Sequence, residues 1–193
     1  YAGYDNPIEV SVPGVPANKV SARISNGNGT LTKNGKGYIC RPSKIGQDVI
    51  IAVSAEQDGR VQGMGDYKFR VRQLPDPTPM IEYVDANGAT QRYRGGGAKL
   101  PKQSLMKADG IIAAIDDGLL NIGFKVISFE MVTFDNMGNA MPEISDGANF
   151  SARQKATMNR LQRGKRFYIS NVKAQGPDGV QRQLSSTLEV ILN

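Results

Sequence analysis

Residues 74–79 read Leu-Pro-Asp-Pro-Thr-Pro, with a proline at every second position. Alternate prolines prevent helix formation and favour extended backbone in the residues that precede them. The segment therefore predicts a semi-rigid joint, roughly 19 Å long if it lies fully in the polyproline II conformation. We expect this joint to separate two domains, residues 1–76 and residues 77–193.

The residues before the joint show only the period of β-strands. Apolar and polar residues alternate over 8–12 and over 67–72, as is typical of strands that are buried on one face. Further strands are predicted over residues 20–24, 38–40 and 49–53, separated by Asn-Gly, Pro-Gly and Asp-Gly turn signals. Several short strands without a helical period predict an immunoglobulin-like β-sandwich.

The first part of the region after the joint mixes helical and strand patterns. Apolar residues at helical spacing predict a helix over residues 104–117, with Gly118 as its C-cap. Residues 122–134 predict a long strand whose alternation changes phase at Ile127. Such a change of phase indicates a β-bulge.

The last part of the chain carries the strongest helix signal. Ser151 and Gln154 have the spacing of a capping box, and Gly164 follows the expected last turn. Two final strands, joined by a Gly-Pro-Asp-Gly turn, are predicted over residues 166–174 and 180–192. The second domain is therefore expected to be α+β, with antiparallel strands and one or two helices.

The composition excludes several classes of chemistry. The 193 residues include no histidine, one cysteine and no tryptophan. Without histidine the chain cannot form a Ser/His/Asp triad, a Cys/His pair or a His-liganded zinc site. A single cysteine, Cys40, excludes a disulfide framework and a Cys-ligated cluster, and we expect it to be a small buried hydrophobe. We expect no catalytic residues, no metal and no cofactor.

Three patterns resemble chemical sites, but each lacks an essential part. Asp116 and Asp117 are adjacent carboxylates, which would point about 100° apart on a helix and are expected to be solvated acids at its end. Residues 135–139 resemble a calcium loop, but Asp146 stands where the loop needs glutamate, so a turn is expected. Residues 95–97 are three glycines without the phosphate-loop spacing. A hydrolase that uses only the two adjacent carboxylates remains a third hypothesis.

The net charge of +6 is concentrated in one segment. Residues 151–166 contain six basic side chains and no acid, and the rest of the chain is neutral. We expect these six residues to bind an acidic protein partner: Arg153, Lys155, Arg160, Arg163, Lys165 and Arg166. The alternative is a solvated helix end whose cations complement the helix dipole. Nucleic acid and direct membrane contact are not expected, because neighbouring aromatic residues are sparse and the helix lacks a large apolar face.

Four segments in a fixed order carry a resemblance to a known family. They are Asn-Pro-Ile-Glu-Val-Ser-Val-Pro-Gly-Val-Pro at 6–16, Phe-Arg-Val-Arg-Gln-Leu-Pro-Asp-Pro-Thr-Pro at 69–79, the basic helix at 151–164, and Phe-Tyr-Ile-Ser-Asn-Val-Lys at 167–173. These segments resemble the C-terminal periplasmic region of the GldM/PorM family of the Bacteroidota type IX secretion and gliding machinery. The resemblance covers essentially the whole chain.

The resemblance implies a mechanical role without catalysis. Family members are dimeric inner-membrane proteins with one transmembrane helix and four periplasmic domains, of which this chain would be the last two. The transmembrane part would join GldL/PorL in a proton-driven motor, and the far end would reach the GldK/GldN (PorK/PorN) ring complex at the outer membrane. Because the chain begins with Tyr1 and has no long apolar run, we expect it to be an excised soluble piece or a processed chain. The resemblance implies that this piece is periplasmic. A secreted adhesin or glycan-binding module of tandem β domains is the alternative.

Overall fold

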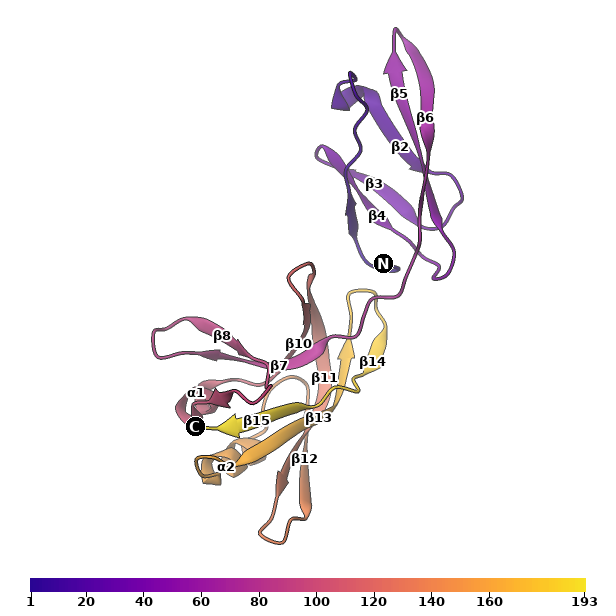
Figure 1. Cartoon of the computed structure of the whole chain (residues 1–193). Helices are drawn as coiled ribbons and strands as arrows, with labels where there is room; N and C mark the ends of the chain where they lie inside the picture. Colours follow the sequence, from indigo (N-terminus) through magenta and orange to yellow (C-terminus); the bar gives the residue numbers. More distant parts are fainter. The chain divides into compact units, whose positions relative to one another are not determined.

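The computed structural model describes all 193 residues, and the chain divides into two compact units, Tyr1–Leu74 and Pro75–Asn193. The fold is mainly β, with antiparallel sheets and few helices (Figure 1). The predicted fold class is confirmed: an immunoglobulin-like β-sandwich is followed by an α+β unit. Neither unit contains a helix that is long and apolar enough to cross a membrane.

The first unit consists of two three-stranded antiparallel sheets, ordered β1-β4-β3 and β2-β5-β6. Its core contains Cys40 from one sheet and Val49, Ile51 and Val53 from the other. The expectation that Cys40 is a small buried hydrophobe is confirmed, and burial raises the pKa of its thiol. The elements are β1 (Asn6–Ile8), the 3-10 helix η1 (Ala17–Lys19), β2 (Val20–Ile24), β3 (Thr30–Asn34), β4 (Gly37–Arg41), β5 (Val49–Gln57) and β6 (Arg60–Phe69).

In the first unit, the alternation of apolar and polar residues predicts which side chains face the core. It is a poorer guide to which residues pair with a neighbouring strand. The strand predicted over 8–12 is wrong beyond Ile8, because β1 ends there. Val10 and Val12 nevertheless pack, partly buried, against the core. The strand β3, which has mostly exposed side chains, has no such pattern and was not predicted.

The second unit is built on one nine-stranded sheet. The order along its main path is β8-β7-β10-β11-β13-β15-β9, while β12 pairs with β11 and β14 pairs with β13. All pairs are antiparallel except β9 with β15. The elements are β7 (Thr78–Val84), β8 (Thr90–Tyr93), β9 (Lys99–Leu100), α1 (Lys102–Lys107), β10 (Ile112–Asp116), β11 (Asn121–Phe134), β12 (Ala140–Asp146), α2 (Ala152–Arg160), β13 (Arg166–Gln175), β14 (Gln181–Gln183) and β15 (Leu188–Leu192).

The long strand β11 serves two neighbours on one edge. Its first residues pair with β10, its last seven pair with β12, and β13 runs along its other edge. Register shifts lie between Val126 and Ser128 and between Ser128 and Glu130, which confirms the predicted irregularity at Ile127. A bulge bends a strand. The end of β11 therefore leaves the centre of the sheet and forms a hairpin with β12 (Figure 1).

The helix predicted over residues 104–117 is wrong beyond Lys107. The chain forms the short helix α1 and then the strand β10, which lies between β7 and β11. Three consecutive residues of β10 are buried, so its sequence lacks the alternation of a half-exposed strand. Gly110 also prevents a continuous helix, because it forms a β-bridge to Asn149. The backbones are close at this bridge: a Cβ added to Gly110 would lie 1.9 Å from the Ala148 carbonyl oxygen.

The proline segment contributes directly to the second unit. Thr78 and Pro79 are the first residues of β7 and pair with β10. Pro79 lies before the ladder to β8, which starts at Ile81, so its missing N–H is not needed there. Asp76 lies 3.4 Å from the guanidinium of Arg182 in β14. Part of the predicted joint is therefore held by the second unit.

Candidate docking surface

The six predicted partner-binding residues do not lie on one helix. Arg153, Lys155 and Arg160 belong to α2, whereas Arg163 and Lys165 lie in the following loop and Arg166 starts β13. The expectation of one basic helix that runs to Gly164 is therefore wrong, because α2 ends at Arg160. The helix ends early because Leu161 is extended, and Gly164 already donates its N–H to the Leu192 carbonyl of the sheet.

Both ends of α2 are fixed by specific contacts. The Ser151 hydroxyl accepts from the Gln154 N–H and the Gln154 side chain accepts from the Ser151 N–H, so the predicted capping box is confirmed. The Gln154 side chain also donates to the Glu143 carbonyl of β12, and Met158 is fully buried. At the other end, the Lys102 ammonium donates to the last carbonyls of the helix. These contacts hold α2 against one face of the sheet.

Three of the six cations already have partners within the unit. Arg153 lies 3.6 Å from the Glu143 carboxylate, although its own side chain is 80% exposed. Arg163 donates to the Asn193 side chain, and Arg166 donates to Glu189 over 3.0 Å. The other three, Lys155, Arg160 and Lys165, form no salt bridge.

The structure brings three of the six cations together at one groove. Arg160, Lys165 and Arg166 line a groove of about 690 Å³ between the loop after α2 and the turn of the β11–β12 hairpin. Its apolar part consists of Leu161, Phe134 and Tyr168, and the two ring centroids lie 6.0 Å apart in an edge-to-face arrangement. We call this site the basic groove.

The one acid that lines the basic groove is committed to its own turn. The Asp135 carboxylate accepts hydrogen bonds from the Asn139 side chain and from the N–H groups of Asn139 and Met137. These bonds hold the pKa of the Asp135 carboxyl below its usual value. The expectation of a turn over 135–139 is thereby confirmed. Three cations against one engaged carboxylate leave the groove with an excess of positive charge.

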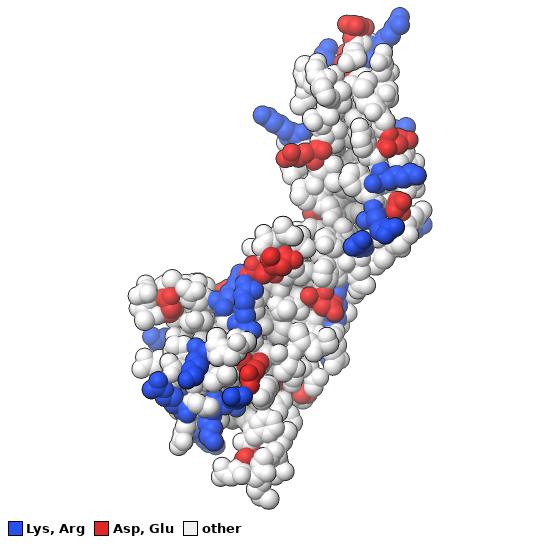
Figure 2. Space-filling view, viewed as in Figure 1, with Lys and Arg blue, Asp and Glu red and all other residues white.

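The charge distribution of the second unit is uneven. Figure 2 shows lysine and arginine gathered over the region of α1, α2 and the C-terminus, and mostly uncharged atoms over the β11–β12 hairpin. The basic groove lies where these two regions meet. A ligand in the groove would therefore contact cations on one side and apolar side chains on the other.

The adjacent carboxylates have structural partners. Asp116 ends the strand β10, not a helix, and accepts hydrogen bonds from Arg92 and Arg94. These bonds, that from Arg92 first, hold the pKa of the Asp116 carboxyl below its usual value. Asp117 accepts from the N–H groups of the next turn, which lowers its pKa as well. Asp116 thus links the end of β10 to the end of β8, and Asp117 holds the turn that follows β10.

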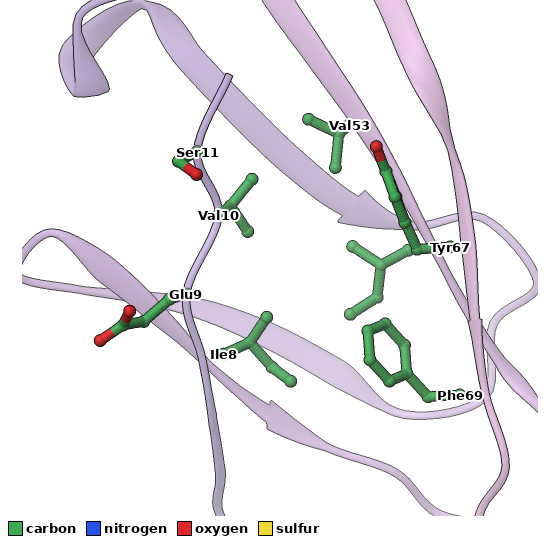
Figure 3. A pocket seen from close by; sticks show the side chains of 8 residues that line it. Ile8, Glu9, Val10, Ser11, Val53, Tyr67 and Phe69 are labelled. Atoms are coloured by element: carbon green, nitrogen blue, oxygen red, sulfur yellow. The ribbon is translucent and has the colours of Figure 1, made fainter. Parts of the chain in front are cut away.

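The first unit has a separate apolar opening of about 200 Å³ (Figure 3). Ile8 and Val10 point toward Tyr67 and Phe69 of β6, whereas Glu9 points away. The register with β5 places both aromatic rings on the core-facing side of β6, yet both rings are partly exposed. They are exposed because β6 is the edge of its sheet.

Comparison with known proteins gives the same result for both units. Residues 1–72 match the model of the GldM third domain, and residues 75–193 match that of the GldM C-terminal domain. The chain belongs to the GldM family. GldM domains of this kind form the C-terminal part of an inner-membrane component of the type IX secretion and gliding machinery. No curated protein matched the chain.

Sequence reasoning missed the apolar half of the basic groove. The alternation over residues 122–134 and 166–174 places Phe134 and Tyr168 in strands but does not bring them together, and no pattern predicts β12. A signal was present, because Phe134 ends the long apolar alternation and Asp135 starts a turn that reverses the chain. That turn returns β12 along the end of β11.

Proposed function

We propose that this chain is a non-enzymatic periplasmic coupling module of the type IX secretion and gliding apparatus. It links a proton-driven motor at the inner membrane, which contains GldL/PorL, to the GldK/GldN (PorK/PorN) ring complex at the outer membrane. Docking on the ring occurs through the basic groove. The observation that carries this proposal is that Arg160 and Lys165 face a groove without any salt-bridge partner in the chain.

The electrostatics favour an acidic protein partner. A single unpaired cation on the surface contributes little free energy of binding. Several cations around one groove attract a complementary acidic surface and raise its rate of association. Arg166 adds a third charge, although it shares Glu189. The only carboxylate in the groove lining is held by its turn. The two adjacent acids of β10 and its turn are likewise engaged, which supports a role without catalysis.

The experiment is a calorimetric titration of the whole chain with the purified ring complex. Arg160→Glu combined with Lys165→Glu should weaken binding at least about tenfold at low salt, and less at high salt because exposed charges are screened. The matched control reverses Lys125 and Lys173, which are exposed on β11 and β13 outside the groove. Unchanged affinity in the groove variant, or an equal loss in the control, would remove the docking role.

The proposal has three further parts, which concern the dimer, the anchor and the joint. Two copies associate as a homodimer, the anchor lies in the rest of the protein, and the proline segment stiffens the joint between the units. Three contacts support a stiff segment: Asp76 pairs with Arg182, and Thr78 and Pro79 pair in a strand. Cross-linking of the chain in solution tests the dimer, because a monomer at all concentrations would contradict it.

A glycan-binding module is the second candidate. The partly exposed rings of Tyr67 and Phe69 at the apolar opening favour it, since sugars bind on aromatic faces (Figure 3). A glycan array on the whole chain decides between the two functions. Specific binding that is lost in Tyr67→Ser would support this candidate, and an array without signal would remove it.

A further inference from the structure

The β11–β12 hairpin has one covered face and one open face. Phe129 and Met131 of β11 are fully buried, and their partners Ser145 and Glu143 of β12 lie on the same face. Gln154 of α2 donates to the Glu143 carbonyl there. The inner face is therefore covered by α2 and belongs to the core.

Apolar side chains also line the outer face of the hairpin. The register pairs Val132 with Pro142 and Phe134 with Ala140, and Ile144 lies two residues beyond Pro142 on the same face, opposite Glu130. The Glu130 carboxylate is not free, because it accepts a hydrogen bond from the Asn171 side chain. Ile144 is 67% exposed and Phe134 is 51% exposed. Single exposed apolar residues are common, but a contiguous group of them marks an interaction site.

The outer face continues into the basic groove. Tyr168 of β13 stands opposite Val132, and its ring contacts that of Phe134. Both aromatic residues line the basic groove together with Arg160 and Lys165. The apolar face and the unpaired cations thus form one continuous surface, which we call the hairpin surface.

The free edge of β12 does not favour the addition of another strand. Hydrogen-bonded and non-hydrogen-bonded pairs alternate in an antiparallel ladder. In this hairpin Asp135 and Asn139 form a hydrogen-bonded pair, because the Asp135 N–H donates to the Asn139 carbonyl. By that count Val132 and Pro142 form a non-hydrogen-bonded pair, so the Pro142 nitrogen faces the free edge. Proline has no N–H to offer a further strand. A partner is therefore expected on the face of the hairpin and not at its edge.

We propose that the hairpin surface binds an extended acidic segment of a protein partner. Apolar side chains of that segment pack on Phe134, Val132 and Ile144, while its carboxylates pair with Arg160 and Lys165. Charge complementarity selects the carboxylates, and the strand-like spacing of the apolar residues selects an extended segment. This inference rests on the proposed function, in which the second unit docks on a protein.

A membrane surface fits the same residues less well. Insertion into lipid needs apolar residues at the tip of the hairpin, but the tip over residues 135–139 is polar apart from Met137. Asp135, which is held charged by its turn, would also face the anionic lipid. The apolar residues lie instead along the length of the strands.

The test uses a random twelve-residue peptide display library selected on the whole chain. The enriched peptides should combine Asp or Glu with aromatic or aliphatic residues. Their affinity, measured as synthetic peptides by fluorescence anisotropy, should fall at least tenfold in Phe134→Ser/Ile144→Ser and in Arg160→Glu/Lys165→Glu. The matched control is Leu119→Ser, which removes an exposed apolar residue from another turn of the unit and should leave binding unchanged.

Four results would overturn the inference. They are a library without enriched peptides, enriched peptides without carboxylates, equal binding by the hairpin variants, and binding of vesicles of anionic lipid with the same dependence on the variants. Thermal melts of each variant should show that the unit remains folded, because the replaced side chains are mainly exposed. Failure of the ring complex to bind the unaltered chain would contradict only the proposed function, because the peptide experiment does not use that complex.

Discussion

Replacement of Arg182 by methionine should destabilise the second unit strongly. The Arg182 side chain is 5% exposed and donates to both oxygens of Asp178, over 3.1 and 2.6 Å. Its guanidinium also lies 5.5 Å above the centre of the Phe124 ring. Methionine preserves much of the volume but removes the guanidinium, and with it the pair with Asp178, the contact with Asp76 and the contact with the Phe124 ring.

The expected loss in free energy of unfolding follows from the burial of Asp178, the partner of Arg182. The Asp178 side chain is also 5% exposed, and after the substitution it retains the hydrogen bond from the Val180 N–H but no cation. Removal of one member of a buried pair costs about 3–5 kcal/mol, since the other charge stays buried without compensation. For a unit of this size that corresponds to a fall of roughly 10–20 °C in melting temperature. Asp178→Asn in the same chain should recover part of the loss.

The pH dependence has a definite sign. The hydrogen bonds from Arg182 lower the pKa of the Asp178 carboxyl in the folded state. A lowered folded pKa contributes stability above the unfolded pKa of about 3.9, and that contribution is lost as the pH falls through the folded pKa. The difference in stability between the unaltered chain and Arg182→Met should therefore be largest near neutral pH and should narrow below about pH 4.

Urea unfolding of the whole chain at several pH values, with amide hydrogen exchange over residues 175–183, measures the loss of stability and its dependence on pH. The control is Arg92→Met, because Arg92 is 33% exposed and pairs with Asp116 over 2.9 Å. An exposed pair of that kind contributes at most about 1 kcal/mol. A cost for Arg182→Met no larger than that of the control, or a difference that grows below pH 4, would refute the argument.

Three further predictions test the local structure. Gly110→Ala should cost at least about 2 kcal/mol, since the new Cβ would overlap the Ala148 carbonyl, whereas Gly123→Ala has open space; urea melts compare the two. Ser151→Ala should cost about 1 kcal/mol through loss of the helix cap, and full stability of this variant in the same melts would contradict the capping box. Cys40 should react with a thiol reagent only after unfolding, because it is buried and its thiol pKa is raised; rapid labelling of the folded chain would oppose this.

The local signals in the sequence were reliable where the chemistry is local. The capping box of Ser151 and Gln154 formed as predicted, because it involves only groups three residues apart. The phase change at Ile127 likewise marked a real irregularity in β11. The same approach did not predict the strand β10, because burial on both faces removes the alternation that distinguishes a strand from a helix.

The sequence by itself determined the mainly β fold, the family and the concentration of positive charge over residues 151–166. Only the tertiary structure decided which of those charges are available. Arg153 and Arg166 pair with carboxylates from β12 and β15, whereas Arg160 and Lys165 line a groove together with Phe134. Charge is a property of each residue, but pairing depends on the distance between atoms that lie far apart in the sequence and close together in the fold.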